Sequence, residues 1–248
     1  MQSVIITGAS GGIGAEIARI FSKNDYFTVL IGRNKTRLLE TTRSLKSPEN
    51  SFSILADIST PDGCKKIFTE FSEKISAKHP LFCLVNNAGI FHRSSFIDTS
   101  DDTWENLFQT NLMSAVRISK LFIPFLEKNK GSSIINISST LGVRSIVETS
   151  AYSALKAAMI RWTETLALEL APNIRVNCVA PGMVLTPIHD FFKNFENSPD
   201  LKESINKAQP LGRIGQPSDI AEAVFFFASN KSNWTTGSIL SVDGGIHL

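Results

Sequence analysis

The sequence Thr7-Gly8-Ala9-Ser10-Gly11-Gly12-Ile13-Gly14 joins two segments of different hydrophobic periodicity. An apolar run, residues 4–7, leads into it, and an amphipathic run of helical period, residues 12–24, continues from it, so it connects a strand to a helix. Glycines allow a tight turn and a close approach to phosphate, and the free N–H groups of a helix N-terminus attract anions. The stretch therefore predicts an α/β fold with a phosphate site at the carboxyl edge of its sheet, where such folds bind ligands. A glycine-rich turn without a ligand is the alternative.

Strand-like and helix-like segments alternate along the rest of the chain. The strand candidates are short and mostly uniformly apolar: residues 4–7, 27–31, 53–56, 82–85, 133–137, 175–179 and 239–242. The helix candidates are residues 12–24, 35–45, 61–78, 102–128, 150–170 and 217–229. Uniformly apolar strands are typical of a parallel sheet that helices cover on both faces. We therefore predict an α/β fold with a doubly wound, seven-stranded parallel sheet, in one domain over residues 1–248.

One long connection interrupts this alternation, between Thr186 and Pro217. A connection of about 30 residues is long for such a fold, and long connections are usually functional or mobile. Phe191, Phe192 and Phe195 lie close together within it. We predict a substrate-binding loop or lid over residues 187–216, with packing of these rings in the core as the alternative.

The composition argues against several classes of function. Lys and Arg number 25 against 23 Asp and Glu, and no basic block occurs, so we expect no nucleic-acid partner. Cys64, Cys83 and Cys178 form no CxxC pair and the four histidines are scattered, so we expect a reducing compartment and no metal site. No apolar run has the length of a membrane span, and the chain begins with a strand rather than a signal peptide. These features predict a cytoplasmic protein without membrane contact.

The chain has two tyrosines, and Tyr152 precedes Lys156 by four residues in a helical pattern, which puts both side chains on one helix face. An ammonium about 6 Å from a phenol lowers the phenol pKa by about two units at an effective dielectric constant near 20. Ser139 follows strand 133–137 at the sheet edge that also carries the glycine loop. A Tyr-x-x-x-Lys pair alone is typical of an ordinary helix face, and Ser138 is a rival hydroxyl. The residues by themselves leave these alternatives open.

Several motifs occur in the order found in one enzyme family. They are TGxxxGxG at residues 7–14, Asp57 after the third strand, Asn86-Asn87-Ala88-Gly89, the set Asn111, Ser139, Tyr152 and Lys156, and Pro181-Gly182 with Thr186. This ordered set resembles the short-chain dehydrogenases/reductases over essentially the whole chain. Residues 237–245 and the motif set resemble the 3-oxoacyl-[acyl-carrier-protein] reductase-like branch. The resemblance implies a single Rossmann-type domain with nicotinamide-dependent oxidoreductase activity, and it selects Ser139 over Ser138.

The resemblance also implies roles for the catalytic set. Ser139 and Tyr152 would hydrogen-bond a substrate carbonyl, the reduced nicotinamide would deliver hydride, and Tyr152 would donate the proton. Lys156 would lower the pKa of Tyr152 and hold the nicotinamide ribose, and Asn111 would position a water molecule. The implied cofactor-binding residues are Gly8, Ser10, Gly12, Ile13, Gly14, Arg33, Asp57, Ile58, Asn87, Ala88, Gly89, Tyr152, Lys156, Pro181, Gly182, Val184 and Thr186.

The choice of nicotinamide cofactor is predicted from the end of the second strand. An acidic residue at that position accepts hydrogen bonds from the ribose of NAD(H). This chain instead has Gly32 followed by Arg33, whose planar guanidinium suits a phosphate. The family often places another basic residue within the glycine loop, where this chain has Gly11. We expect NADP(H) in preference to NAD(H), with Arg33 as a solvated turn residue in the alternative.

The expected function is NADP(H)-dependent interconversion of a ketone and a secondary alcohol, with a 3-oxoacyl-[acyl-carrier-protein] reductase as the leading assignment. A sugar, polyol or other small-alcohol dehydrogenase is the alternative within the family. A non-catalytic nucleotide-binding sensor or scaffold is the alternative outside it. We expect a small carbonyl or alcohol substrate, free or carrier-bound, contacting Arg93, Glu148, Phe191 and Phe192. The resemblance further implies a homotetramer or homodimer.

Overall fold

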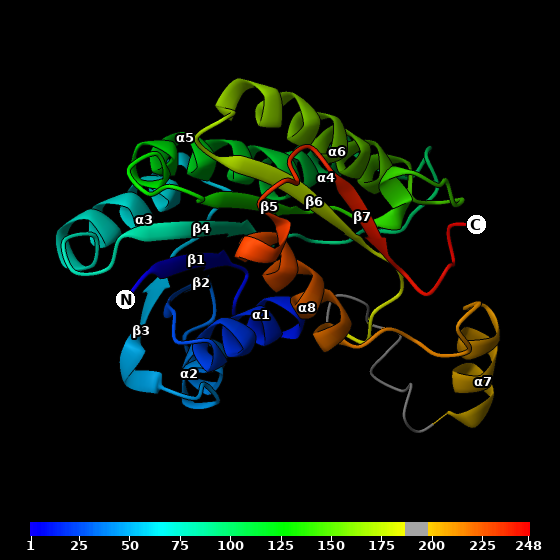
Figure 1. Ribbon diagram of the computed structural model, residues 1–248. Coiled ribbons are helices and arrows are strands. Elements are labelled where there is room, and N and C mark those ends of the chain that lie inside the picture. The colour runs from blue at the N-terminus through cyan, green and yellow to red at the C-terminus, as the bar shows by residue number, and fades with distance from the viewer. Residues whose placement is uncertain (187–197) are drawn as a thin grey trace.

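Seven strands form one parallel sheet in the computed structural model, which describes residues 1–186 and 198–248 (Figure 1). The strands lie in the order β3-β2-β1-β4-β5-β6-β7, so the chain winds outward in one direction through β3 and in the other from β4. They are β1 (Ser3–Thr7), β2 (Phe27–Gly32), β3 (Ser51–Leu55), β4 (Leu81–Asn86), β5 (Ser133–Ile137), β6 (Arg175–Pro181) and β7 (Ile239–Val242). All six neighbouring pairs are parallel, which confirms the predicted doubly wound sheet.

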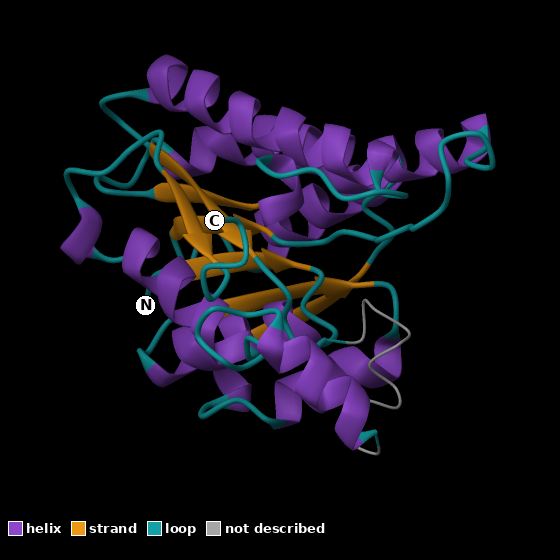
Figure 2. Ribbon diagram, turned by 90° about the vertical axis from the view of Figure 1, so that its right-hand side faces the viewer, coloured by secondary structure: helices purple, strands orange, loops and turns teal. Residues whose placement is uncertain are grey.

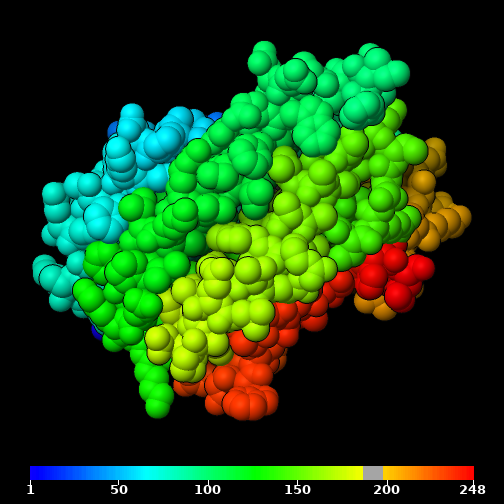
Figure 3. All heavy atoms as spheres, turned by 90° about the horizontal axis from the view of Figure 1, so that it is seen from above, coloured from blue at the N-terminus to red at the C-terminus, as the bar shows by residue number. Residues whose placement is uncertain are grey.

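Helices cover both faces of this sheet (Figure 2). One face carries α1 (Gly12–Lys23), α2 (Lys35–Arg43) and α8 (Pro217–Ala228). The opposite face carries α3 (Pro61–Lys74), α4 (Asp101–Phe108), α5 (Ser114–Leu126) and α6 (Ser150–Leu170), and α4 to α6 dominate the view in Figure 3. Because helices cover both faces, every position of β1, β2, β4 and β5 is buried. Two-sided burial explains why these strands are uniformly apolar rather than alternating.

The helix predicted over residues 102–128 contains an interruption. A π-helical turn, η2 (Gln109–Met113), separates α4 from α5. The side chain of Gln109 accepts a hydrogen bond from Arg117, which also donates to the Ser59 carbonyl. Single π-helical turns inside helices are frequent at functional sites, and this one contains Asn111. The sequence could not reveal the interruption, because residues 109–113 contain no glycine or proline to mark it.

The connection predicted as a substrate loop or lid is described in part. Phe191, Phe192 and Phe195 lie outside the described residues, so the structure does not test their expected role. Downstream of them is α7 (Pro199–Lys207), a helix that the polar sequence did not predict. Val184 and Gly215 pair in a short parallel bridge. The two ends of the connection therefore meet beside the end of β6.

Candidate active site

The glycine loop lies at the carboxyl end of β1, where the backbone packs too closely for side chains. Gly8 has φ +69°, and a Cβ at this position would lie 2.9 Å from the Cα of Ala88. A Cβ on Gly14 would lie 2.3 Å from the carbonyl oxygen of Gly8. These two glycines are therefore required for the loop to close against the start of α1 and the end of β4.

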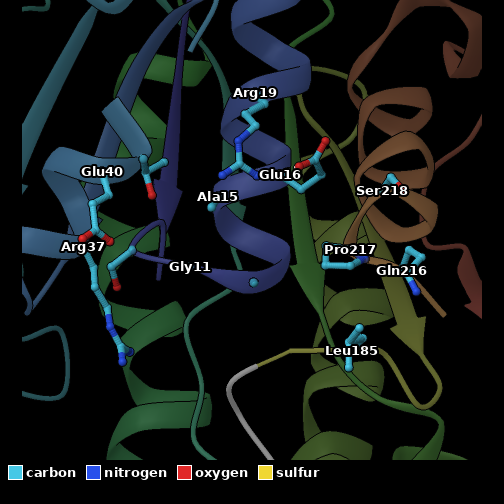
Figure 4. Close-up of a pocket in the computed structure, with 13 residues that line it drawn as sticks. Gly11, Ala15, Glu16, Arg19, Arg37, Glu40, Leu185, Gln216, Pro217 and Ser218 are labelled. Atoms are coloured by element: carbon cyan, nitrogen blue, oxygen red, sulfur yellow. Dashed lines mark hydrogen bonds and ion pairs between the residues drawn. The ribbon is translucent and has the colours of Figure 1, made fainter. Parts of the chain in front are cut away.

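The N-terminus of α1 has the properties of an anion site. No side chain caps it, and its first turn contains no acidic residue. The first N–H groups of a helix have no intrahelical partner and carry the positive end of the dipole. A cavity of about 530 Å³ opens beside Ser10, Gly11 and Gly12 (Figure 4). The glycine-lined backbone and this uncapped helix fit the pyrophosphate of a dinucleotide.

Three arginines lie near this cradle, Arg19 of α1, Arg33 after β2 and Arg37 of α2, and the sequence did not single out Arg19 or Arg37. Arg33, directly after β2, lies 3.6 Å from the carboxylate of Asp57. Arg37 of α2 lines the same cavity as Ser10 and lies with Glu40 on the α2 side of it, across from Gln216 of the α8 start (Figure 4). Asn34 is the sequence feature from which Arg37 could have been predicted. The Asn34 side chain caps the N-terminus of α2 by accepting from the Arg37 N–H, which places this arginine in the first turn of the helix.

Asp57 lies at the end of the third strand as predicted. Its carboxylate accepts hydrogen bonds from the N–H and the hydroxyl of Ser59, at 3.0 and 2.7 Å. Burial acts to raise the pKa of Asp57, but the Ser59 hydrogen bonds and the Arg33 charge outweigh it and hold the pKa below its usual value. Asp57 is thus an ionised acceptor next to the cradle. The neighbouring Ile58 is buried.

The segment Asn87 to Gly89 connects the glycine loop to the candidate catalytic residues. The hydroxyl of Thr7 accepts from the N–H groups of Asn87 and Ala88, both at 3.0 Å, and the Asn87 amide donates to the Thr7 carbonyl. A Cβ on Gly89 would lie 2.7 Å from the side-chain oxygen of Asn111. Hydrogen bonds therefore join the ends of β1 and β4. Position 89 accommodates only a glycine, because any Cβ would lie too close to Asn111.

Ser139, Tyr152 and Lys156 come together at the carboxyl end of β5. Tyr152 and Lys156 are buried on one face of α6, and the Lys156 Nζ lies 5.6 Å from the centre of the Tyr152 ring. Lys156 Nζ donates to the carbonyl of Ile137 at 2.9 Å, and Tyr152 is hydrogen-bonded to the Ser139 side chain. The rival hydroxyl, Ser138, donates instead to the main-chain carbonyl of Lys156. The geometry therefore favours Ser139 as the hydroxyl that faces a substrate beside Tyr152.

Burial shifts the pKa values of Tyr152 and Lys156. Burial raises the pKa of Tyr152 to about 12, and the Ser139 hydrogen bond opposes this only in part. Burial also lowers the pKa of Lys156 to about 8, with Cys178 acting in the opposite direction. Desolvation of the phenol therefore gives Tyr152 a net pKa above its ordinary value, and the expected lowering of that pKa by Lys156 stays a prediction. Tyr152 is consequently protonated at neutral pH.

Asn111 is buried in the π-helical turn and contacts the segment after Gly89. Its side-chain oxygen accepts from the N–H of Ile90 at 2.8 Å, and its amide donates to the Ile90 carbonyl at 3.0 Å. Asn111 therefore anchors the loop that follows β4. Its expected role in positioning a water molecule stays a prediction.

The segment predicted to hold the nicotinamide lies at the end of β6. A Cβ on Gly182 would lie 2.6 Å from the Cβ of Asp243, and the Gly182 N–H donates to the carbonyl of Val242. Val184 and Thr186 are buried directly after this contact. The end of β7 and the residue after it thus pack directly against the Pro181-Gly182 turn.

The two described substrate candidates lie on separate loops and contact each other. Arg93 Nε is 2.8 Å from the Glu148 carboxylate, and both side chains are about half exposed. Glu148 has φ +67°, a left-handed conformation that costs a residue other than glycine about 1 kcal/mol or more. The ring of Phe91, which the sequence did not single out, packs edge-on against Tyr152 with ring centres 4.9 Å apart.

Two features are absent from the described residues. Within residues 1–186 and 198–248, no three His, Cys, Asp or Glu side chains come together as a metal site. No helix in this same part of the chain has the length and apolar character that crossing a membrane requires.

Comparison with known proteins agrees with this arrangement. Residues 8–247 match the family model described as enoyl-(acyl carrier protein) reductase. The chain is 34% identical to the 3-oxoacyl-[acyl-carrier-protein] reductase of Chlamydia muridarum, over 99% of this chain and 97% of the relative. It is 35% identical to the L-fucose dehydrogenase of Bos taurus, over 99% of this chain and 89% of the relative. The solved L-sorbose reductase of Gluconobacter frateurii, complexed with NADPH and L-sorbose, superimposes with a TM-score of 0.90 at 31% identity, over 99% of this chain and 96% of that one. The chain therefore belongs to the short-chain dehydrogenase/reductase family, whose members are oxidoreductases that bind a nicotinamide cofactor.

Proposed function

We propose that this protein catalyses the NADP(H)-dependent interconversion of a ketone and a secondary alcohol. The observation that carries the proposal is the meeting of Ser139, Tyr152 and Lys156 at the same sheet edge as the glycine cradle. A nucleotide sensor or scaffold would need the cradle but not a buried phenol between a hydroxyl and an ammonium.

The protein side chains divide the work of the reaction. The reduced cofactor, when bound, supplies the hydride. The hydroxyl groups of Ser139 and Tyr152 donate hydrogen bonds to the substrate carbonyl oxygen and orient it. Tyr152, protonated at neutral pH, gives its proton to that oxygen, and the Lys156 ammonium beside the ring stabilises the phenolate that remains. In the alcohol-oxidising direction the same groups act in reverse order.

Preference for NADP(H) is supported by the charges at the adenosine end. Arg33 is exposed and held near Asp57, and Arg37 lines the cavity beside Ser10 and Gly11. Two guanidinium groups favour a 2′-phosphate, and the position of Gly32 supplies no acid that would repel it. The family often places a second basic residue in the glycine loop, where this chain has Gly11. Arg37 of α2 takes the place of that basic residue.

A 3-oxoacyl thioester is the substrate class that we favour. Two loops lie near Tyr152, residues 90–98 and residues 143–149. Both expose large apolar side chains, which suit an acyl chain better than a polyol. These side chains are Phe96, Ile97, Val143, Ile146 and Val147. A sugar or polyol substrate is the second candidate, supported by the similarity to the fucose and sorbose enzymes and by the polar pair Arg93–Glu148.

A direct test is oxidation of NADPH, followed at 340 nm, with a panel of β-ketoesters, 3-oxoacyl thioesters, ketoses and simple ketones. We expect the highest kcat/KM with the 3-oxoacyl compounds. A higher kcat/KM with ketoses would favour the second candidate. Tight NADPH binding without oxidation across the whole panel would contradict the enzymatic proposal and favour the sensor.

We also propose that the protein assembles as a homotetramer or homodimer, located in the cytoplasm. β7 is an edge strand of the sheet, and large apolar side chains are exposed on and near it and on α6: Leu168, Phe226, Trp234 and Leu240. Contact between subunits would remove this apolar surface from water. Size-exclusion chromatography with light scattering tests the proposal, and a monomer at micromolar concentration would contradict it.

A further inference from the structure

Two loops meet at the mouth of the site, residues 90–98 after β4 and residues 143–149 before α6. Besides the ion pair between Arg93 and Glu148, the N–H of Ser94 donates to the Glu148 carbonyl at 3.0 Å. We propose that Arg93 and Glu148 are positioning residues: they form a clasp between the two loops that holds the ring of Phe91 against the catalytic phenol of Tyr152.

Phe91 lies between two anchored points of its loop. On one side, Asn111 makes both of its side-chain hydrogen bonds to the backbone of Ile90. On the other side, Glu148 binds Arg93 through its side chain and Ser94 through its carbonyl. The intervening ring meets Tyr152 edge-on, at 4.9 Å and an interplanar angle of 82°. The position of the ring over the phenol therefore depends on both anchors.

The backbone at Glu148 supports a specific task for its carboxylate. Its φ of +67° is the conformation that glycine adopts without penalty. This chain nevertheless has a glutamate there, and its carboxylate pairs with Arg93 on the facing loop. Among the described residues, Asp25 is the other residue besides glycine with a positive φ, and it pairs with Lys46 at 3.1 Å in the turn between α1 and β2. Asp25 provides a matched control, since it has the same backbone conformation and an exposed ion pair at the opposite edge of the sheet.

The clasp has a consequence for catalysis, and this part of the inference rests on the proposed function. A fixed aromatic edge limits the orientations of Tyr152 and keeps water from the phenol, both of which favour proton donation to a bound carbonyl. Opening the clasp should therefore lower kcat/KM without weakening cofactor binding, because neither loop residue belongs to the glycine cradle.

The kinetic test uses NADPH and ethyl acetoacetate at low ionic strength. We expect Glu148→Gln and Arg93→Gln each to lower kcat/KM about three- to tenfold, and the exchanged variant Arg93→Glu/Glu148→Arg to recover most of the loss. Asp25→Asn should leave kcat/KM unchanged. The loss in the single variants should shrink at high salt, since screening weakens the wild-type ion pair.

Glu148→Gly separates the clasp from simple loop stability. Glycine relaxes the left-handed backbone, so the melting temperature should stay the same or rise, while kcat/KM falls as in Glu148→Gln. If glycine restored or increased kcat/KM, the carboxylate would have no positioning role and the proposal would be overturned.

Hydrogen exchange of the unliganded protein provides a readout that does not depend on activity. In Glu148→Gln and Arg93→Gln, peptides that contain the Ser94 amide should exchange at least about threefold faster, with recovery in the exchanged variant. Unchanged exchange in both single variants would overturn the clasp whether or not the enzyme reduces any ketone. Faster exchange with no NADPH oxidation by the wild type would support the clasp and contradict the proposed function.

Discussion

The cofactor side and the reaction side of one sheet edge are built in different ways. On the cofactor side, the decisive features are backbone ones: an uncapped helix start and glycines such as Gly8 and Gly14 that leave no room for a Cβ. On the reaction side, the decisive features are functional groups on side chains, Ser139, Tyr152 and Lys156, which two elements of the fold bring together.

This difference predicts different responses to substitution. A backbone site should fail when any atom is added at a crowded position, and should tolerate change at an open one. A side-chain site should fail when one functional group is removed, even where the shape is kept.

Removal of the Tyr152 hydroxyl should have the largest effect on activity. Tyr152→Phe keeps the ring but removes the proposed proton donor, so we expect kcat to fall about 10³-fold, within the usual range for general acid catalysis. NADPH binding, measured by fluorescence titration, should be unchanged. Tyr26→Phe is the control, because Tyr26 packs against the core beside Phe21, far from the site in sequence, and it should keep full activity. A Tyr152→Phe enzyme with more than a tenth of wild-type kcat would refute the mechanism.

Addition of a methyl group at Gly14 should have the largest effect on the cofactor side. The new Cβ would lie 2.3 Å from the Gly8 carbonyl oxygen, so we expect Gly14→Ala to lower the free energy of unfolding by about 2–3 kcal/mol and to weaken NADPH and NADH binding alike. Gly11→Ala is the control, since a Cβ there meets nothing within 4 Å and the backbone is extended. Chemical denaturation measures the free energy of unfolding of both variants. Equal values for Gly14→Ala and Gly11→Ala would contradict the predicted role of backbone crowding at Gly14.

Reversal of charge at Arg33 should change the preference between NADPH and NADH without changing the fold. Arg33→Asp would repel a 2′-phosphate and accept from a ribose hydroxyl, so we expect the ratio of kcat/KM for NADPH over NADH to fall about 10- to 100-fold. Arg37→Gln should lower the same ratio about threefold. Arg19→Gln is the control: Arg19 lines the same cavity but is bound to Glu16 and Ser44, so the ratio should not change. An unchanged ratio in Arg33→Asp would remove the main support for NADP(H).

Replacement of Lys156 should reveal a conflict between function and stability. Burial lowers the Lys156 pKa to about 8 in the folded protein, against about 10.4 for a free lysine, so the folded state binds the proton less well. Below pH 8 both states carry the charge and the fold bears the full cost of burying it. Lys156→Met should therefore be inactive yet more stable at pH 7, on the order of 1–3 kcal/mol.

The pH dependence gives the sign of this effect. Between pH 8 and about 10.4 the unfolded chain holds a proton that the folded protein has released, so the wild type gains stability as pH rises and the advantage of Lys156→Met shrinks. Thermal unfolding at pH 7 and pH 9.5 tests this. An advantage that grows with pH would show that the buried ammonium is not the cause.

Much of the fold could be predicted because its signals are local. Seven apolar runs and the helices between them can be identified without knowledge of their partners, since two-sided burial makes each strand of the sheet uniformly apolar. The prediction failed at the π-helical turn around Asn111 and at α7, where hydrogen bonds and packing rather than periodicity decide the backbone.

The candidate site was predictable to a different degree on its two sides. The glycine loop could be predicted from a few consecutive residues. Arg37 could not, because only the packing of α2 brings it to the same cavity. Ser138 and Ser139 are indistinguishable by sequence position, and their hydrogen bonds, to Lys156 and to Tyr152, separate them. The ion pair between Arg93 and Glu148 joins loops 55 residues apart, which neither loop reveals alone.

The sequence by itself determined the order of strands and helices, the phosphate-binding backbone and the spacing of Tyr152 and Lys156, because each depends on residues close together in the chain. Tertiary structure decided which serine faces the phenol, which arginines line the cradle and whether the Tyr152 pKa rises or falls. Those outcomes depend on desolvation and on contacts between distant segments. Burial removes water from the phenol and the ammonium alike, and only the folded chain sets how much.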